Sequence, residues 1–143
     1  MKCRLVVVGK LSDSFAREWV GEYEKRLTKY CAFEVVETKE QPTLDKERDL
    51  VLRLIPDGSV LVVLAIQGKI LSSEVFADWL GKQSGKITFV IGSDKGLHQE
   101  VVQKAHLCLS FGSMTLPHKI ARLVFTEQLY RAFSILKHEP YHK

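Results

Sequence analysis

The stretch Val60-Leu61-Val62-Val63-Leu64-Ala65-Ile66 decides the fold of this chain, because an unbroken apolar run leaves no face for solvent. Such a run, rich in β-branched residues, is typical of a strand that is buried on both sides of a sheet. Similar segments recur at Leu5–Val8, Phe33–Val36, Ile87–Ile91 and Leu107–Leu109. We therefore expect five strands in one parallel sheet that is covered on both faces.

Helical patterns fill the intervals between these strands. Asp13–Tyr30 has the clearest helical spacing, with Phe15, Trp19 and Tyr23 on one stripe. The remaining helices are expected to start at Thr43, at Ser72 or Ser73, at His98 and near Pro117. Strands and helices in alternation predict an α/β fold. The length of 143 residues fits a single domain, 1–143.

Composition excludes several classes of protein. No apolar run is long enough for a transmembrane helix, and the apolar start is too short for a signal peptide, so we expect no membrane partner. Cys3, Cys31 and Cys108 lie far apart and form no CxxC motif, which predicts reduced thiols in a cytoplasmic protein. The histidines lack zinc spacing, so no metal is expected. The net charge of +4 permits an RNA partner without demanding one.

Three loops follow strands at the edge of the sheet where ligands of α/β proteins bind: after Leu64, after Ile91 and at Phe111–Leu116. Phe111–Leu116 combines backbone hydrogen-bonding groups with an apolar wall, which suits an adenine ring. It could equally be a buried entry to the last helix, with Thr115 as the cap. Gly92 allows a ligand to approach the backbone, although the segment also fits an ordinary turn.

The last helix and the tail carry the most distinctive residues. Pro117–Leu136 is apolar almost all round, which predicts burial on more than one side and a second subunit against it. Glu127 and Arg131 have the spacing of a helical ion pair, while Arg131 could instead bind a phosphate or a cofactor carboxylate. Pro140-Tyr141-His142-Lys143 offers a stacking ring, an imidazole and a cation, which are groups that hold a nucleotide or move a proton.

Three motifs together resemble a known family: Thr115-Leu116-Pro117-His118, Glu127-Gln128-Leu129-Tyr130-Arg131-Ala132 and Pro140-Tyr141-His142-Lys143. They are similar to the small SPOUT-class methyltransferases of bacteria, which modify N3 of a pseudouridine in large-subunit ribosomal RNA. The resemblance extends over the whole chain. It implies a C-terminal trefoil knot in the α/β domain, a homodimer, S-adenosylmethionine as the cofactor and ribosomal RNA or the ribosome as the partner.

The resemblance also implies two sets of site residues. The cofactor would contact Leu64, Gly92, Phe111, Gly112, Ser113, Met114, Thr115 and Leu116. The catalytic set would be Arg131, Tyr141 and His142, with His142 as the candidate general base. The chain has Gly92-Ser93-Asp94-Lys95-Gly96 where the family usually has Gly-Gly-Pro-Glu-Gly, and Leu64-Ala65 where it usually has Leu-Asp.

Two other functions fit the same residues. One is a nucleotide-binding α/β module without catalysis, such as a flavodoxin-like regulator, which would not need the tail. The other is a ribosome-binding protein that kept the knotted fold and lost the chemistry. Cofactor binding separates the first from an enzyme, and methyl transfer to ribosomes separates the second.

Overall fold

The computed structural model describes residues 1–143 and is built around one parallel sheet with the strand order β2-β1-β4-β3-β5. The five strands are β1 (Lys2–Val8), β2 (Ala32–Thr38), β3 (Val60–Ile70), β4 (Lys86–Ile91) and β5 (Leu107–Ser110). Every pairing between neighbouring strands is parallel. The expected α/β fold and all five expected strands are confirmed, although β3 continues four residues beyond the apolar run.

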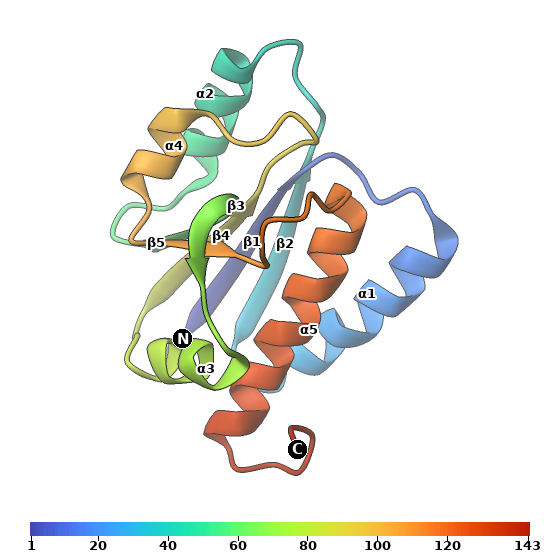
Figure 1. Ribbon diagram of the computed structural model, residues 1–143, viewed down its shortest axis with the longest axis vertical. Coiled ribbons are helices and arrows are strands. Elements are labelled where there is room, and N and C mark those ends of the chain that lie inside the picture. Colours follow the sequence, from blue (N-terminus) through green and yellow to red (C-terminus); the bar gives the residue numbers. More distant parts are fainter.

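Helices cover both faces of the sheet, as the continuous apolar strands predicted (Figure 1). The helices are α1 (Ser14–Leu27), α2 (Leu44–Leu54), α3 (Ser73–Gly81), α4 (Gln99–Lys104) and α5 (His118–Leu136). A large buried cluster lies under α1, α3 and α5, and a smaller one lies under α2 and α4. None of these helices combines the length and the apolarity that crossing a bilayer requires.

Three helix starts follow from short polar side chains, as expected. The carboxylate of Asp13 accepts a hydrogen bond from the amide of Ala16 at 3.1 Å, and the hydroxyl of Thr43 accepts one from Lys46 at 3.2 Å. Ser72 caps α3 in the same way. The fourth helix is shorter than expected, because His98 is its N-cap and the chain leaves the helix at Ala105.

The helices next to α5 account for much of its apolar surface. It lies between α1 and α3, and both of these helices contact it (Figure 1). Phe125, Leu129 and Phe133 are buried within the same subunit. Neighbouring helices therefore explain much of what the sequence analysis attributed to a second subunit.

The apolar stripe of α1 is not the core face throughout. Phe15 is 81% exposed and Trp19 is 59% exposed, whereas Val20 and Leu27 are buried. The helix itself is confirmed, but the aromatic side chains of its first two turns lie on the surface. Exposed aromatic side chains of this size are typical of a surface that binds a partner.

The end of β3 passes across β5. Leu109 of β5 pairs with Leu64 and again with Lys69, so the residues between them leave the ladder and return to it. Gly68 lies directly against the β5 backbone, where a Cβ atom would approach the Cys108 carbonyl oxygen to 2.6 Å. Figure 1 shows this part of β3 curling over the β5 arrow. Such a crossing supports the trefoil knot that the resemblance implies, and the knot itself stays a prediction.

Candidate cofactor pocket and C-terminal tail

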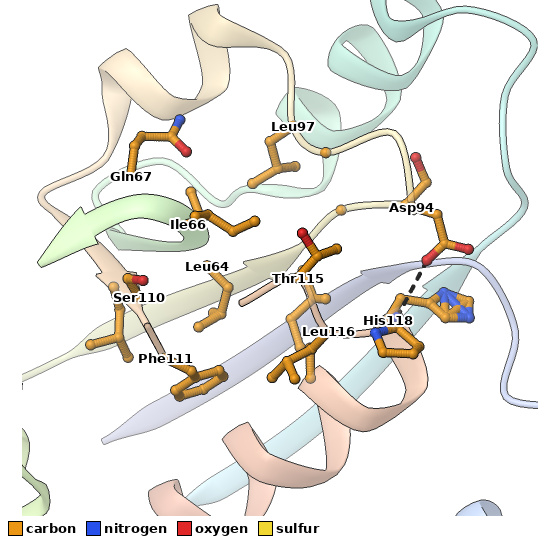
Figure 2. Close-up of a pocket in the computed structure, with 18 of the residues that line it drawn as sticks. Leu64, Ile66, Gln67, Asp94, Leu97, Ser110, Phe111, Thr115, Leu116 and His118 are labelled. Carbon is orange, nitrogen blue, oxygen red and sulfur yellow. Dashed lines mark hydrogen bonds between the residues drawn. The ribbon is translucent and has the colours of Figure 1, made fainter. Parts of the chain in front are cut away.

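A pocket of about 670 Å³ lies at the carboxyl ends of β3, β4 and β5. It is formed by the three loops that the sequence analysis selected (Figure 2). Figure 2 shows Leu64 and Ile66 across the pocket from Thr115 and Leu116. The position agrees with the rule for ligands of open α/β sheets, and the volume falls in the range of small-molecule sites.

Most of the residues expected at the cofactor line this pocket. They are Leu64, Gly92, Phe111, Gly112, Met114, Thr115 and Leu116. Ser113 does not line it, although its two neighbours do. The loops are thus brought together as expected, while the individual contacts to a cofactor stay predictions.

The segment Phe111–Leu116 is an open loop and not a buried helix entry. Met114 is 83% exposed, and α5 begins after Pro117 without a side-chain cap, so Thr115 does not cap it. Gly112 has a φ of +119°, and the Ser110 hydroxyl holds it by hydrogen bonds to its amide and carbonyl, both at 3.0 Å.

The same loop keeps backbone groups available for a ligand. No intramolecular hydrogen bond involves the backbone amides or carbonyls of Met114, Thr115 or Leu116. All three residues line the pocket. Unpaired amides and carbonyls beside an apolar wall can bond the polar edge of a flat ring, which fits an adenine.

Gly92 is needed for a reason that differs from the expected one. A Cβ atom at this position would lie 2.9 Å from the Gly96 carbonyl oxygen and 2.9 Å from the Leu97 side chain. The turn itself therefore fills the space beside Gly92. A larger residue would displace the loop in addition to blocking a ligand. Loss of cofactor binding in such a variant would therefore not show where the cofactor binds.

Several residues that complete the pocket were not among the expected cofactor contacts. Ile66 and Leu97 extend its apolar wall, and Asp94 and His118 stand at one side (Figure 2). The carboxylate of Asp94 accepts a hydrogen bond from the His118 amide at 3.3 Å, which ties the β4 loop to the start of α5. For Asp94 and Leu97, the available signal was their position in the loop that follows β4.

The tail forms a second cluster, in which Tyr141 contacts α1 and α5. Its hydroxyl donates to Glu127 at 3.0 Å and lies 3.2 Å from the hydroxyl of Tyr23. Its ring meets the ring of Tyr130 edge to face, with the centroids 4.7 Å apart. Burial, followed by the hydrogen bonds to Tyr23 and Glu127, raises the pKa of Tyr141 well above its usual value.

His142 lies between a cation and a carboxylate. Its Nδ1 is 3.0 Å from the Arg131 guanidinium, and its Nε2 is 2.7 Å from the Glu74 carboxylate. A guanidinium only donates, so Nδ1 must accept and the ring proton lies on Nε2, directed at Glu74. Hydrogen bonds from its own backbone amide and from His142 lower the pKa of Glu74.

Arg131 makes the expected ion pair with Glu127, whose carboxylate oxygen lies 2.6 Å from Nη2. The catalytic candidates Arg131, Tyr141 and His142 therefore do meet in one cluster. They do not meet the pocket. At the α-helical rise, Arg131 lies roughly 20 Å along α5 from His118 at the pocket.

The comparison with known families identifies the chain as a methyltransferase of the SPOUT class. The family model described as "Predicted SPOUT methyltransferase" matches residues 1–142, and the chain belongs to this family. Relatives over the full length of both chains include proteins named "Ribosomal RNA large subunit methyltransferase H" from Streptococcus uberis, 38% identical, and from Streptococcus equi subsp. zooepidemicus, 39% identical.

A solved structure gives the same answer for the fold. A probable methylase family protein from Haemophilus influenzae superimposes with a TM-score of 0.59 at 16% identity. The match covers 99% of this chain and 70% of the other. At this identity the likeness shows the fold alone, and it agrees with the SPOUT assignment.

Proposed function

We propose that this protein transfers a methyl group from S-adenosylmethionine to N3 of a pseudouridine in large-subunit ribosomal RNA. This proposal rests on relatives that are 38% and 39% identical over the full length of both chains and are named as large-subunit ribosomal RNA methyltransferases. The pocket at the carboxyl edge of the sheet supports it independently, because its size and lining suit a nucleoside. A ribosomal substrate places the reaction in the cytoplasm.

The residues of the pocket fit the cofactor. Leu64, Ile66 and Leu116 would enclose the adenine, and the backbone of Met114–Leu116 would bond its polar edge. S-adenosylmethionine supplies a methyl group on a positively charged sulfur, which makes that carbon electrophilic. The chain must hold the RNA base in line with this carbon and keep water away, and such positioning can contribute several kcal/mol.

The tail would supply the proton transfer. As the new bond to N3 forms, the proton on N3 must leave, and the His142 imidazole can accept it at Nδ1 once Arg131 has turned from that nitrogen to the RNA. Glu74 would then face the proton on Nε2 of the resulting imidazolium. Tyr141 can stack on a base, and Arg131 can bind a phosphate.

A complete site of this kind needs two copies of the chain, because the tail lies far from its own pocket. We expect a homodimer in which the tail of one subunit adjoins the pocket of the other. Exposed apolar side chains support such an interface, among them Phe15, Trp19, Ile70 and Met114. Sedimentation at micromolar concentration should show a dimer, and a monomer would contradict the arrangement.

Tritium transfer from labelled S-adenosylmethionine to ribosomal particles tests the reaction directly. Label should appear in large-subunit RNA, and nucleoside analysis should find it on N3 of a pseudouridine. The same assay on free RNA, isolated subunits and assembled ribosomes identifies the form of the substrate. Absence of label in all of them, with cofactor binding intact, would favour the ribosome-binding alternative.

A further inference from the structure

Glu47 is a buried carboxylate that lies outside both the pocket lining and the tail cluster. It lies on α2, is only 2% exposed, and its hydrogen-bond partner is a neutral hydroxyl, that of Ser93. Burying an ionisable group without a counter-charge costs free energy. Burial, together with the charge of Glu40, raises the pKa of Glu47, and hydrogen bonds from Ser93 with the charge of Lys95 offset part of that rise.

The one side chain that bonds this carboxylate belongs to the pocket. The Ser93 hydroxyl donates to Oε2 of Glu47 at 2.9 Å, whereas Oε1 is buried and has no partner. Ser93 lines the pocket, and Glu47 does not. The contact therefore joins a residue that lines the pocket to α2.

Ser93 is also the first residue of the tight turn that ends at Gly96. The Gly96 amide donates to the Ser93 carbonyl at 2.9 Å, and Gly96 has a φ of +82°. The next residue, Asp94, bonds the first amide of α5. Fixing Ser93 consequently fixes a turn that reaches from α2 to the start of α5 along one wall of the pocket.

We propose that Glu47 is a positioning residue for the cofactor pocket, where its carboxylate anchors Ser93 and holds the Gly92–Gly96 turn in its binding shape. The inference rests on the proposed function, because the pocket must take S-adenosylmethionine for the anchor to affect affinity. Glu47 touches no ligand, and its effect passes through the Ser93 hydroxyl.

Calorimetric titration with S-adenosylmethionine tests the anchor through a double-mutant cycle. Glu47→Ala and Ser93→Ala should each weaken binding by about 10-fold, which corresponds to roughly 1.4 kcal/mol. Ser93→Ala also removes the 3.4 Å hydrogen bond from the Lys95 amide to the Ser93 hydroxyl. The double variant should therefore bind no worse than Ser93→Ala alone, because the Glu47–Ser93 contact is already absent in that variant. Glu47→Gln keeps an oxygen that accepts from Ser93, so it should bind within about 3-fold of the wild type.

Val51→Ala is the matched control, since Val51 is fully buried one turn further along α2. It should lower the melting temperature without changing cofactor affinity. Unchanged affinity in Ser93→Ala, or additive losses in the double variant, would overturn the proposal.

Amide hydrogen exchange in the cofactor-free protein separates this inference from the proposed function. Glu47→Ala should speed exchange at Asp94, Lys95 and Gly96, and Val51→Ala should not. If the wild type bound no S-adenosylmethionine, the proposed function would fail, yet the exchange result would still decide whether Glu47 holds the turn. Equal exchange in Glu47→Ala and wild type would refute the anchor.

Discussion

The pocket and the tail differ in how their polar groups are used. Around the pocket, Met114, Thr115 and Leu116 leave their backbone groups unpaired. In the tail, Tyr141 and His142 already bond Tyr23, Glu127, Arg131 and Glu74. The pocket is thus ready to accept a ligand as it stands, whereas the tail must exchange existing hydrogen bonds for new ones.

This difference predicts separate phenotypes for the two regions. Changes at the pocket should act on cofactor affinity, because its free groups gain partners only from a ligand. Changes in the tail should act on the rate, because its bonds are rearranged when RNA binds. Variants of the pocket and of the tail test this separation.

The largest effect is expected from removing the tail. Deleting Tyr141–Lys143 should reduce methyl transfer by at least about 10²-fold, because a general base and a substrate contact are both lost. Cofactor affinity should stay nearly unchanged, since no tail residue lines the pocket. A truncated protein that methylates ribosomes at the full rate would show that the base lies elsewhere.

Filling the pocket should have the next largest effect. Ala121 of α5 lines the pocket, and Ala121→Phe should place a ring in the space of the cofactor. We expect affinity for S-adenosylmethionine to fall by at least about 10-fold, equivalent to roughly 1.4 kcal/mol. Ala121→Ser keeps the side chain small and serves as the control. Equal affinity in the phenylalanine variant would exclude this pocket as the cofactor site.

Mixing these two variants tests whether the pocket and the tail of one active site come from the same subunit or from two different subunits. Tail-deleted and Ala121→Phe chains are each impaired, but a mixed dimer contains one intact pocket and one intact tail. If the site forms between subunits, exchange of chains should restore part of the methyl transfer. Activity that stays at the level of the separate variants would place pocket and tail in the same subunit.

The smallest effect is expected at Glu74, whose side chain is 61% exposed. Glu74→Gln still accepts from Nε2 of His142, and exposed ion pairs contribute little stability, so the melting temperature should barely change. The pKa of Glu74 is lowered from 4.5, so its stabilising contribution is present above that pH and lost as pH falls through the lowered value. Thermal melts of both proteins should therefore coincide in acid. A large loss of stability at neutral pH would contradict this assignment.

Periodicity and loop position predicted the sheet, its five strands and the three pocket loops, because these depend on local apolar runs and on the general geometry of parallel sheets. The exposure of Phe15 and Trp19 could not be predicted, since helical spacing identifies a stripe but not what covers it. Glu74 and Glu47 were missed for a related reason: each acts on a residue far away in sequence, and no local pattern marks such a contact.

The passage of β3 across β5 has a consequence for the order in which the chain can fold. The segment around Gly68 is synthesised before β5, yet the two backbones lie in direct contact with one above the other. The crossing can therefore form only after β5 has been synthesised, and it is a non-local step that slows folding. The Phe111–Leu116 loop and the start of α5 line the pocket and follow β5 in the chain, so a chain that ends before them lacks part of the pocket wall.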